Sequence, residues 1–261
     1  MMSILCSNAG NLWIAIYQKG VMMIPAQPNS FKYIGYKSIN KNIIGSNCIT
    51  SLCRDHEGIL WIGTDNDGIY GITTELKQKV HYAPHDSPSS VPSTVFGLYE
   101  DSEHNLWFGS YTNGLGRLDK KTGQCSYLQN LTDKNGNRIQ RVYDLVEDQD
   151  KRLWIATMGA GLFYYDLKTG QSVYDPKFNA ATKKYKWISC LLYAGDNHLY
   201  VGTYDGIRCI DLSTDDFKTE EILSRHIIHS LYEDPQGNIW IGSSDGLAEW
   251  NPQTQQLKTY N

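Results

Sequence analysis

The pentapeptide Asn105-Leu106-Trp107-Phe108-Gly109 recurs along the chain in six closely related copies. The other five are Asn11-Leu12-Trp13-Ile14-Ala15, Ile59-Leu60-Trp61-Ile62-Gly63, Arg152-Leu153-Trp154-Ile155-Ala156, His198-Leu199-Tyr200-Val201-Gly202 and Asn238-Ile239-Trp240-Ile241-Gly242. Their central aromatic residues lie about 40 to 48 residues apart, and the copies fill the chain. Self-similarity at such a period is the sequence signature of a repeat architecture.

Each copy has the same surroundings. In four copies an acid opens the turn between two expected strands: Asp55, Asp101, Asp148 and Asp234. A glycine follows the aromatic residue, at a second turn where we expect a positive φ: Gly20, Gly68, Gly114, Gly161, Gly206 and Gly246. A third strand, a turn of the Lys121-Thr122-Gly123 type and a fourth short strand complete the copy. The predicted unit is a four-stranded antiparallel meander.

The second strand determines how these meanders pack. A sheet with one solvated face alternates apolar and polar residues, whereas Leu60-Trp61-Ile62 is apolar on both faces. Neighbouring meanders can cover both faces by stacking around an axis, each Trp filling the space left where the residue two positions further on is only Gly or Ala. The sequence therefore predicts an all-β fold, a β-propeller built from six four-stranded antiparallel blades. A flat solenoid of stacked sheets is the structural alternative.

Composition narrows the classes of partner. Lys and Arg number 24 against 28 Asp and Glu, a formal charge of −4, so the chain lacks the basic face of a nucleic-acid binder. No stretch approaches the roughly 18 apolar residues of a membrane helix, and we expect no direct membrane insertion of this segment. The start of the chain lacks the basic flank and apolar run of a secretory signal. Of the six cysteines, Cys53 and Cys190 fall in expected first strands and are interpreted as small buried hydrophobic residues.

The repeat resembles a known family. The pattern Leu60-Trp61-Ile62-Gly63-Thr64, then Asp67-Gly68-Ile69 or Gly161-Leu162, then Tyr165-Asp166 before Thr169-Gly170, is similar to the two-component regulator propeller repeat. In that family, long arrays form the periplasmic sensor region of hybrid two-component systems, best represented in gut Bacteroidetes. The resemblance covers nearly the whole chain. The departures, Tyr200 for Trp and Ala15 and Ala156 for Gly, affect blade packing and leave the fold prediction intact.

The resemblance also implies an arrangement of domains. Members of the family usually carry seven blades per propeller, often in tandem propellers that precede an immunoglobulin-like domain, a membrane helix and a kinase. We therefore expect this chain to be part of a seven-bladed or tandem array. We expect residues 1–37 to form blade one, either of this propeller or as the last blade of an upstream propeller. Residues 38–48 would form a connection, and residues 49–261 would form five further blades. A lone six-bladed ring is the alternative.

Several motifs suggest chemistry that their context does not support. Gly242-Ser243-Ser244-Asp245-Gly246 fits the pattern of a nucleophile elbow, but it falls on a turn between strands and not between a strand and a helix. The pairs His81 and His85, and His226 and His229, lack a Cys or carboxylate cluster at zinc-site spacing. Asp65-Asn66-Asp67-Gly68 resembles a calcium loop without its conserved spacing of ligands. We therefore predict no catalytic residue, no metal site and no cofactor.

The predicted ligand site lies at one mouth of the propeller channel. The segments leading into the first strands and the turns between second and third strands gather on that face, where loops can vary while the blades hold them. Arg141 and Trp187 occupy the same repeat position on successive blades. An indole can stack on a sugar ring while a guanidinium binds its hydroxyl or carboxylate groups. The second turns add Asp65, Asp67, Tyr111, Asn113, Tyr204 and Asp205.

Three functions compete at this stage. The leading interpretation is a non-catalytic ligand-sensing module that responds to an oligosaccharide or another small ligand and contacts a neighbouring propeller or receptor copy. Its periplasmic localisation is implied by the resemblance alone. The second is a propeller enzyme, a lyase or a glycan-cleaving enzyme, with His226, His229 and Glu233 as candidates. The third is a protein-docking platform. An alternative for Trp187 is packing beneath its own loop, Lys183-Lys184-Tyr185-Lys186.

Overall fold

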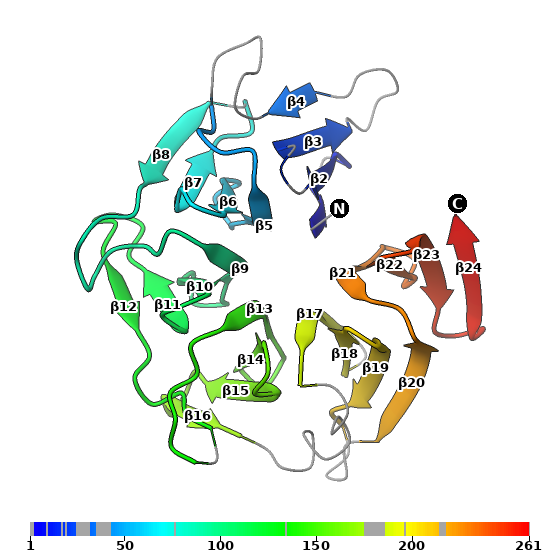
Figure 1. The fold of residues 1–261 in the computed structure, drawn as a ribbon. Coiled ribbons are helices and arrows are strands. Elements are labelled where there is room, and N and C mark those ends of the chain that lie inside the picture. The colour runs from blue at the N-terminus through cyan, green and yellow to red at the C-terminus, as the bar shows by residue number, and fades with distance from the viewer. Residues whose placement is uncertain are drawn as a thin grey trace. The chain divides into compact units, whose positions relative to one another are not determined.

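The computed structural model describes residues 3–8, 10–16, 18, 20–24, 32–34, 43–75, 77–133, 135–174, 186–195, 197–213 and 218–260. These residues form six four-stranded sheets and contain no helix. Each sheet has its strands side by side in chain order and paired antiparallel, as Figure 1 shows. The fold is thus an all-β propeller of six four-stranded blades, which confirms the prediction from the repeat.

The strands of each blade follow the predicted meander. Blades one to three comprise β1 (Ser3–Cys6), β2 (Leu12–Ile16), β3 (Gly20–Ile24), β4 (Lys32–Ile34); β5 (Ile49–Arg54), β6 (Leu60–Thr64), β7 (Ile69–Ile72), β8 (Gln78–Tyr82); and β9 (Val95–Glu100), β10 (Leu106–Ser110), β11 (Leu115–Leu118), β12 (Cys125–Tyr127). Blades four to six comprise β13 (Val142–Glu147), β14 (Arg152–Thr157), β15 (Leu162–Asp166), β16 (Gln171–Val173); β17 (Ile188–Ala194), β18 (His198–Thr203), β19 (Gly206–Asp211), β20 (Thr219–Ser224); and β21 (Ile228–Glu233), β22 (Ile239–Ser243), β23 (Gly246–Asn251), β24 (Gln256–Tyr260).

The chain divides into two compact units of three blades each, Met1–Leu128 and Gln129–Asn261. In the first unit β1 contacts β5 and β5 contacts β9, and in the second β13 contacts β17 and β17 contacts β21. The first strands of consecutive blades therefore pack against one another within each unit. Within each unit, this packing places the first strand of a blade beside its counterpart on the next blade.

In four repeats the central aromatic residue lies in a core shared with the next blade: Trp13, Trp61, Trp154 and Tyr200. Trp61 shares a buried cluster with Leu98 and Phe108 of the following blade, and Trp154 shares one with Leu191 and Val201. Trp154 is fully buried, and Trp61 is 3% exposed. The prediction that each blade buries its indole under the adjoining blade is confirmed for these pairs.

The reason for the small residue after the aromatic differs from the expectation. A Cβ added to Gly63 would lie 3.0 Å from Val95 Cγ1 and 3.1 Å from Val95 O, and one added to Gly202 would lie 2.9 Å from Ile228 Cγ2. Val95 and Ile228 begin the first strands of the next blades. The nearest atoms of all are Ser51 Oγ and Cys190 Sγ on the first strands of the same blades. The glycines therefore leave room for the first strands of their own and the next blade, and the prediction that the indole fills this space is wrong.

The turn acids bind the buried indoles. In blade three, one oxygen of Asp101 accepts the backbone N–H groups of Glu103 and Asn105, and the other accepts Trp107 Nε1–H at 2.7 Å. The same indole bond joins Asp55 to Trp61, Asp148 to Trp154 and Asp234 to Trp240 at 2.7–2.9 Å. Asp101 is only 2% exposed, so the carboxylate is buried together with its donors. In blades two and four the turn is thereby tied to the core shared with the next blade.

Removal of this carboxylate should strongly destabilise the fold. We expect Asp101→Ala to lower the free energy of unfolding by about 3 kcal/mol, because it leaves the indole N–H and turn N–H groups buried without an acceptor. Denaturant unfolding followed by tryptophan fluorescence measures the loss. The control is Asp119→Ala, which removes an exposed turn acid that binds the N–H groups of Lys121 and Thr122 and no indole in the described residues. Equal losses for the two variants would contradict the role of the indole bond.

Polar side chains also link the first strands of consecutive blades. The register of the first strand shifts at one position in blades two to six, a β-bulge that re-aims the side chain there. Thr50 and Ser189, at two of these bulges, donate to the carbonyls of Val95 and Ile228 on the next blade. Beside the bulge of blade four, Asp144 accepts the N–H of Leu191 at 2.8 Å. Burial raises the pKa of Asp144 to about 6.

This shift predicts a pH dependence of stability with a definite sign. Because the pKa of Asp144 is higher in the folded chain, its contribution is present below about pH 4 and is lost as the pH rises through about 6. We expect the free energy of unfolding of the wild type, relative to Asp144→Asn, to fall between pH 4 and pH 7 in denaturant titrations. Because backbone N–H donors lower the pKa of Asp119, the free energy of unfolding of the wild type relative to Asp119→Asn should fall only below about pH 4 and stay level between pH 5 and pH 7. Parallel profiles for wild type and Asp144→Asn would refute the assignment.

Candidate functional site

Backbone hydrogen bonds hold the predicted site residues at one end of each blade. Met158 N donates to Arg141 O at 3.2 Å, and Tyr204 N donates to Trp187 O at 3.4 Å. In blade two, Asp65 N donates to Cys48 O at 2.9 Å. The segment leading into the first strand therefore lies beside the second turn of the same blade, as the repeat predicted.

A hydroxyl side chain fixes the second turn in five blades. Thr64 Oγ1 donates to Gly68 O at 2.8 Å, and the corresponding pairs are Ser110 with Gly114, Thr157 with Gly161, Thr203 with Gly206 and Ser243 with Gly246. All six glycines of this turn have a positive φ, between 72° and 132°, as expected. The φ of Gly206 is 132°, and a Cβ there would lie 1.9 Å from Leu223 O. These turns are rigid supports for the residues between hydroxyl and glycine.

Consecutive blades are joined at the same end. Thr94 Oγ1 donates to Asp65 Oδ1 at 2.8 Å, and the two residues form an isolated antiparallel bridge. Met158 of blade four forms such a bridge with Trp187 of blade five. Because Met158 also bonds to the backbone of Arg141, Arg141 and Trp187 flank it on either side. The structure thus confirms that Arg141 and Trp187 are neighbours on successive blades.

The exposed aromatic residues gather on these turns. Trp187 is 45% exposed and Tyr204 is 44% exposed, and their rings contact each other with centroids 5.5 Å apart and planes inclined at 50°. In the first unit, Tyr111 is 42% exposed and packs edge-on against Phe96. Loop residues 183–185, under which Trp187 was alternatively expected to pack, lie outside the described residues.

The acidic residues of the predicted site have structural partners. Asp67 accepts the hydroxyl of Tyr70, and its carbonyl oxygen and a carboxylate oxygen lie 2.8 and 3.4 Å from His81 Nε2. Burial and the Asp67 carboxylate raise the pKa of Tyr70. Asp65 accepts Thr94 as described, and Asp205 accepts the N–H of Arg225 through its carbonyl. The carboxylates of Asp65 and Asp67 therefore support the turn, whereas Asp205 does so through its backbone.

The eight predicted residues form two sets. Asp65, Asp67, Tyr111 and Asn113 belong to the first unit, and Arg141, Trp187, Tyr204 and Asp205 belong to the second. Within the second set, Arg141, Trp187 and Tyr204 converge on the end of blades four and five. In the first set, Asn113 N binds Ser110 Oγ at 2.8 Å, which orients the turn beside Tyr111.

The candidate catalytic residues do not converge. His229 and Glu233 are four residues apart on strand β21, about 13 Å along an extended chain. His226 precedes that strand and pairs with Asp245, Nε2 to Oδ2 3.2 Å. Burial lowers the pKa of His229, which favours its neutral form. The serine of the elbow-like motif, Ser244, lies on the turn between β22 and β23, and no helix follows it.

One group of side chains in the described part of the chain has the spacing of metal ligands. The ligand atoms of His56, Glu100 and His104 all lie within 4.8 Å of one another, and the two imidazoles stack with centroids 3.7 Å apart. Glu100 already accepts Lys120 Nζ and His56 Nδ1, each at 2.8 Å. Burial raises the pKa of Glu100, but hydrogen bonds from Lys120 and His56 outweigh this effect. The net pKa of Glu100 is therefore lowered. A cation here would have to displace Lys120, and the predicted pairs of histidines lie elsewhere.

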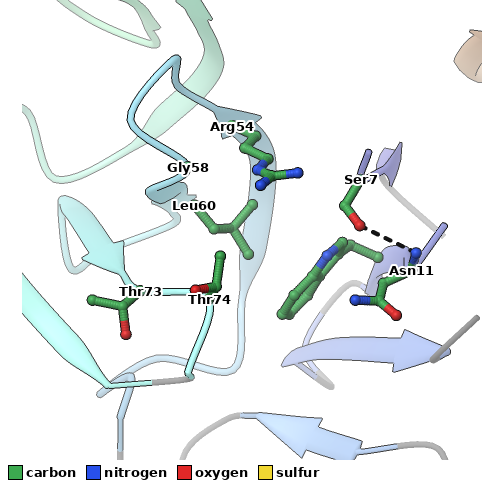
Figure 2. Close-up of a pocket in the computed structure, with 8 residues that line it drawn as sticks. Ser7, Asn11, Arg54, Gly58, Leu60, Thr73 and Thr74 are labelled. Carbon is green, nitrogen blue, oxygen red and sulfur yellow. Dashed lines mark hydrogen bonds between the residues drawn. The ribbon is translucent and has the colours of Figure 1, made fainter. Parts of the chain in front are cut away.

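A cavity between blades one and two was not foreseen. It has a volume of about 100 Å³ and is lined by Ser7, Asn11, Trp13, Arg54, Gly58, Leu60, Thr73 and Thr74 (Figure 2). Arg54 ends strand β5, at the repeat position that Glu100, Glu147 and Glu233 occupy on other blades. The replacement of an acid by Arg at this position is the sequence signal that could have found the cavity.

The cysteines match their sequence interpretation. Cys53 and Cys190 are buried in first strands, and burial raises the pKa of Cys53 to about 12. All six cysteines are free. In the described residues, no helix reaches the length and apolarity needed to span a membrane.

Comparison with known proteins identifies the repeat. The family model of the two-component regulator propeller matches residues 43–66, 89–112, 132–159 and 222–245. These segments contain the first turns of blades two, three, four and six, the four blades with an aspartate–indole bond. Four segments of the chain therefore match the repeat of the two-component regulator propeller family. No curated protein sequence matches it significantly.

Solved structures with the same fold include proteins of two different kinds. One is a protein described as the extracellular domain of the hybrid two component system BT4673 from B. thetaiotaomicron, with TM-score 0.76 and 20% identity. The match covers 100% of this chain and 36% of that one, so this chain spans about a third of its length. The other kind is virginiamycin B lyase from Staphylococcus aureus, with TM-score 0.70, 15% identity and coverage of 99% and 83%. At these identities the likeness establishes the fold alone.

Exposure of Trp187 can be measured in solution. The other tryptophans are buried or half-buried, so Trp187 should supply most of the fluorescence that iodide can quench. We expect Trp187→Phe to abolish most of the iodide-accessible fraction, whereas Trp250→Phe, which removes a tryptophan that is 9% exposed, should leave it unchanged. A quenchable fraction that persists in Trp187→Phe would mean that the side chain lies under its loop.

Proposed function

We propose that the chain is a non-catalytic, extracytoplasmic ligand-sensing module of a hybrid two-component sensor and that its ligand is an oligosaccharide. The repeat family supports the sensor assignment, and the resemblance to an extracellular sensor domain supports a periplasmic location. The observation that carries the ligand class is the exposed pair of Trp187 and Tyr204 beside Arg141.

These three residues suit a sugar for separate reasons. An indole and a phenol whose rings are inclined at 50° present two apolar faces on which C–H surfaces of sugar rings can stack. Arg141 is exposed and held by its backbone to Met158, so its guanidinium can donate in a fork to hydroxyl or carboxylate oxygens. Rigid second turns hold the aromatic residues in place before the ligand binds, which lowers the entropic cost of binding.

Signalling then requires differential affinity. A ligand shifts a receptor between two arrangements only if it binds one of them more tightly. The partner that changes its contact with the chain would be a neighbouring propeller or a second receptor copy. The residues that lie between the hydroxyl side chain and the glycine of a second turn can contact that partner. The blade is not disturbed, because the turn is fixed by its own hydrogen bonds.

The enzymatic alternative has one observation in its favour. A lyase has the same fold, and His226 with Asp245 forms a pair exposed on the second turn of blade six. The separation of His229 from Glu233 along β21 weighs against a joint role for these two residues. A docking platform would use the same exposed aromatic residues. Turnover of carbohydrate substrates favours an enzyme, and a melting temperature that no glycan shifts favours docking.

The proposal is tested by a panel of plant, host and microbial oligosaccharides in a thermal-shift screen, followed by calorimetry on any ligand found. We expect Trp187→Ala to weaken binding at least tenfold and Arg141→Ala to weaken it severalfold, because stacking and charged hydrogen bonds are lost. Trp250→Phe serves as the control for an aromatic change outside the site. Unchanged affinity in both site variants would eliminate this site.

A further inference from the structure

The cavity between blades one and two holds an arginine with an uncompensated nitrogen. Arg54 Nη1 is buried and has no hydrogen-bond partner among the described residues. A buried charge without a partner is costly and is therefore found paired in most structures. The eight residues that line the cavity include no acid, so nothing in its wall balances the guanidinium.

The neutral side chains of the wall are arranged as donors. Ser7 Oγ accepts the N–H of Asn11 at 3.1 Å, and Thr73 Oγ1 accepts the N–H of Lys77 at 3.3 Å. A hydroxyl that already accepts from the backbone keeps its own O–H for donation. Figure 2 shows the guanidinium of Arg54 reaching from its strand toward Ser7, with Thr73 and Thr74 on the side of blade two. The cavity thus offers donors from both blades.

The rest of the wall is apolar and the space is small. Trp13 and Leu60, which are 6% and 5% exposed, contribute carbon surface beside the guanidinium. A volume of about 100 Å³ exceeds the space of a single water and accommodates a small polar group with part of its carbon skeleton. Gly58, with φ +84°, lies beside Arg54, and a Cβ there would be in van der Waals contact with Nη2 at 3.4 Å.

We propose that this cavity binds the carboxylate of a small organic acid or of an acidic sugar. A planar guanidinium matches a carboxylate through two parallel hydrogen bonds, and one positive charge balances one negative charge. A doubly charged phosphate would bring excess buried charge to a wall with a single cation. The site lies at the first turns, where Ser7 and Gly58 follow β1 and β5, and it is separate from the second-turn site of Trp187.

Calorimetric titration of the whole chain with acetate, D-glucuronate, D-glucose and inorganic phosphate tests this assignment. We expect saturable binding of acetate and glucuronate and none of glucose. Arg54→Gln should weaken carboxylate binding at least tenfold, because a charged hydrogen-bonded pair is lost. Tighter binding of glucuronate than of acetate assigns the acidic sugar as source, and equal binding assigns the carboxylate group alone; both support the site.

Matched variants separate this site from general effects. Arg208→Gln removes an arginine that pairs with Glu221 on blade five and should leave acetate binding unchanged. Ser7→Ala keeps Arg54 and should weaken binding about threefold, which provides a second test if Arg54→Gln fails to fold. Trp187→Ala should not affect acetate, so failure here is distinguishable from failure of the glycan proposal. Undiminished acetate binding in Arg54→Gln, absence of carboxylate binding, or tighter binding of phosphate than of acetate overturns the proposal.

Discussion

The hydrogen bond from a buried indole to the aspartate of the first turn is the interaction on which the blades depend. In blade four, Asp148 satisfies the turn with one oxygen and the indole of Trp154 with the other, so a single side chain joins a surface turn to the core shared with blade five. A tryptophan can then fill a dry interface without leaving its N–H unpaired. In blade five the aromatic residue is Tyr200 and the turn position holds Ala194, so the indole N–H and its carboxylate acceptor are replaced together. Blade one keeps Trp13 and substitutes Ser7 as the turn acceptor.

The strand order, the glycine turns and the burial of the aromatic residues could be predicted because they follow from the local pattern. A strand that is apolar on both faces must be covered on both faces. A glycine repeated at one position indicates a backbone conformation, such as a positive φ, that other residues rarely adopt. The aspartate–indole bond was missed because an acid at a turn has a sufficient local explanation. Its spacing of six residues before Trp, repeated in four copies, was the available signal. The role of Gly63 was also misjudged, since a repeat pattern does not show whether an indole or a neighbouring strand approaches it.

At the candidate site, the sequence predicted where residues lie on the blades more reliably than which side chains they contact. The repeat register assigns Arg141 and Trp187 to equivalent places, and backbone bonds confirm that they flank Met158. The contact between Trp187 and Tyr204 depends on side-chain rotamers, which spacing does not determine. Asp67 was predicted to belong to the ligand site. In the structure its carboxylate accepts the hydroxyl of Tyr70 and lies beside His81, and these two residues are on strands β7 and β8 of the same blade.

Function in such an array is expected where a copy departs from the repeat while its supporting bonds persist. Blade two retains its aspartate, indole, glycine and hydroxyl, so it can carry Arg54 at the position of Glu100 and Glu147 without losing its fold. On blade three the acid at this position is balanced by Lys120, whereas Arg54 has no such partner in the cavity wall. An unbalanced charge in a stably supported blade is better explained by a ligand than by packing, because an apolar residue there would cost less.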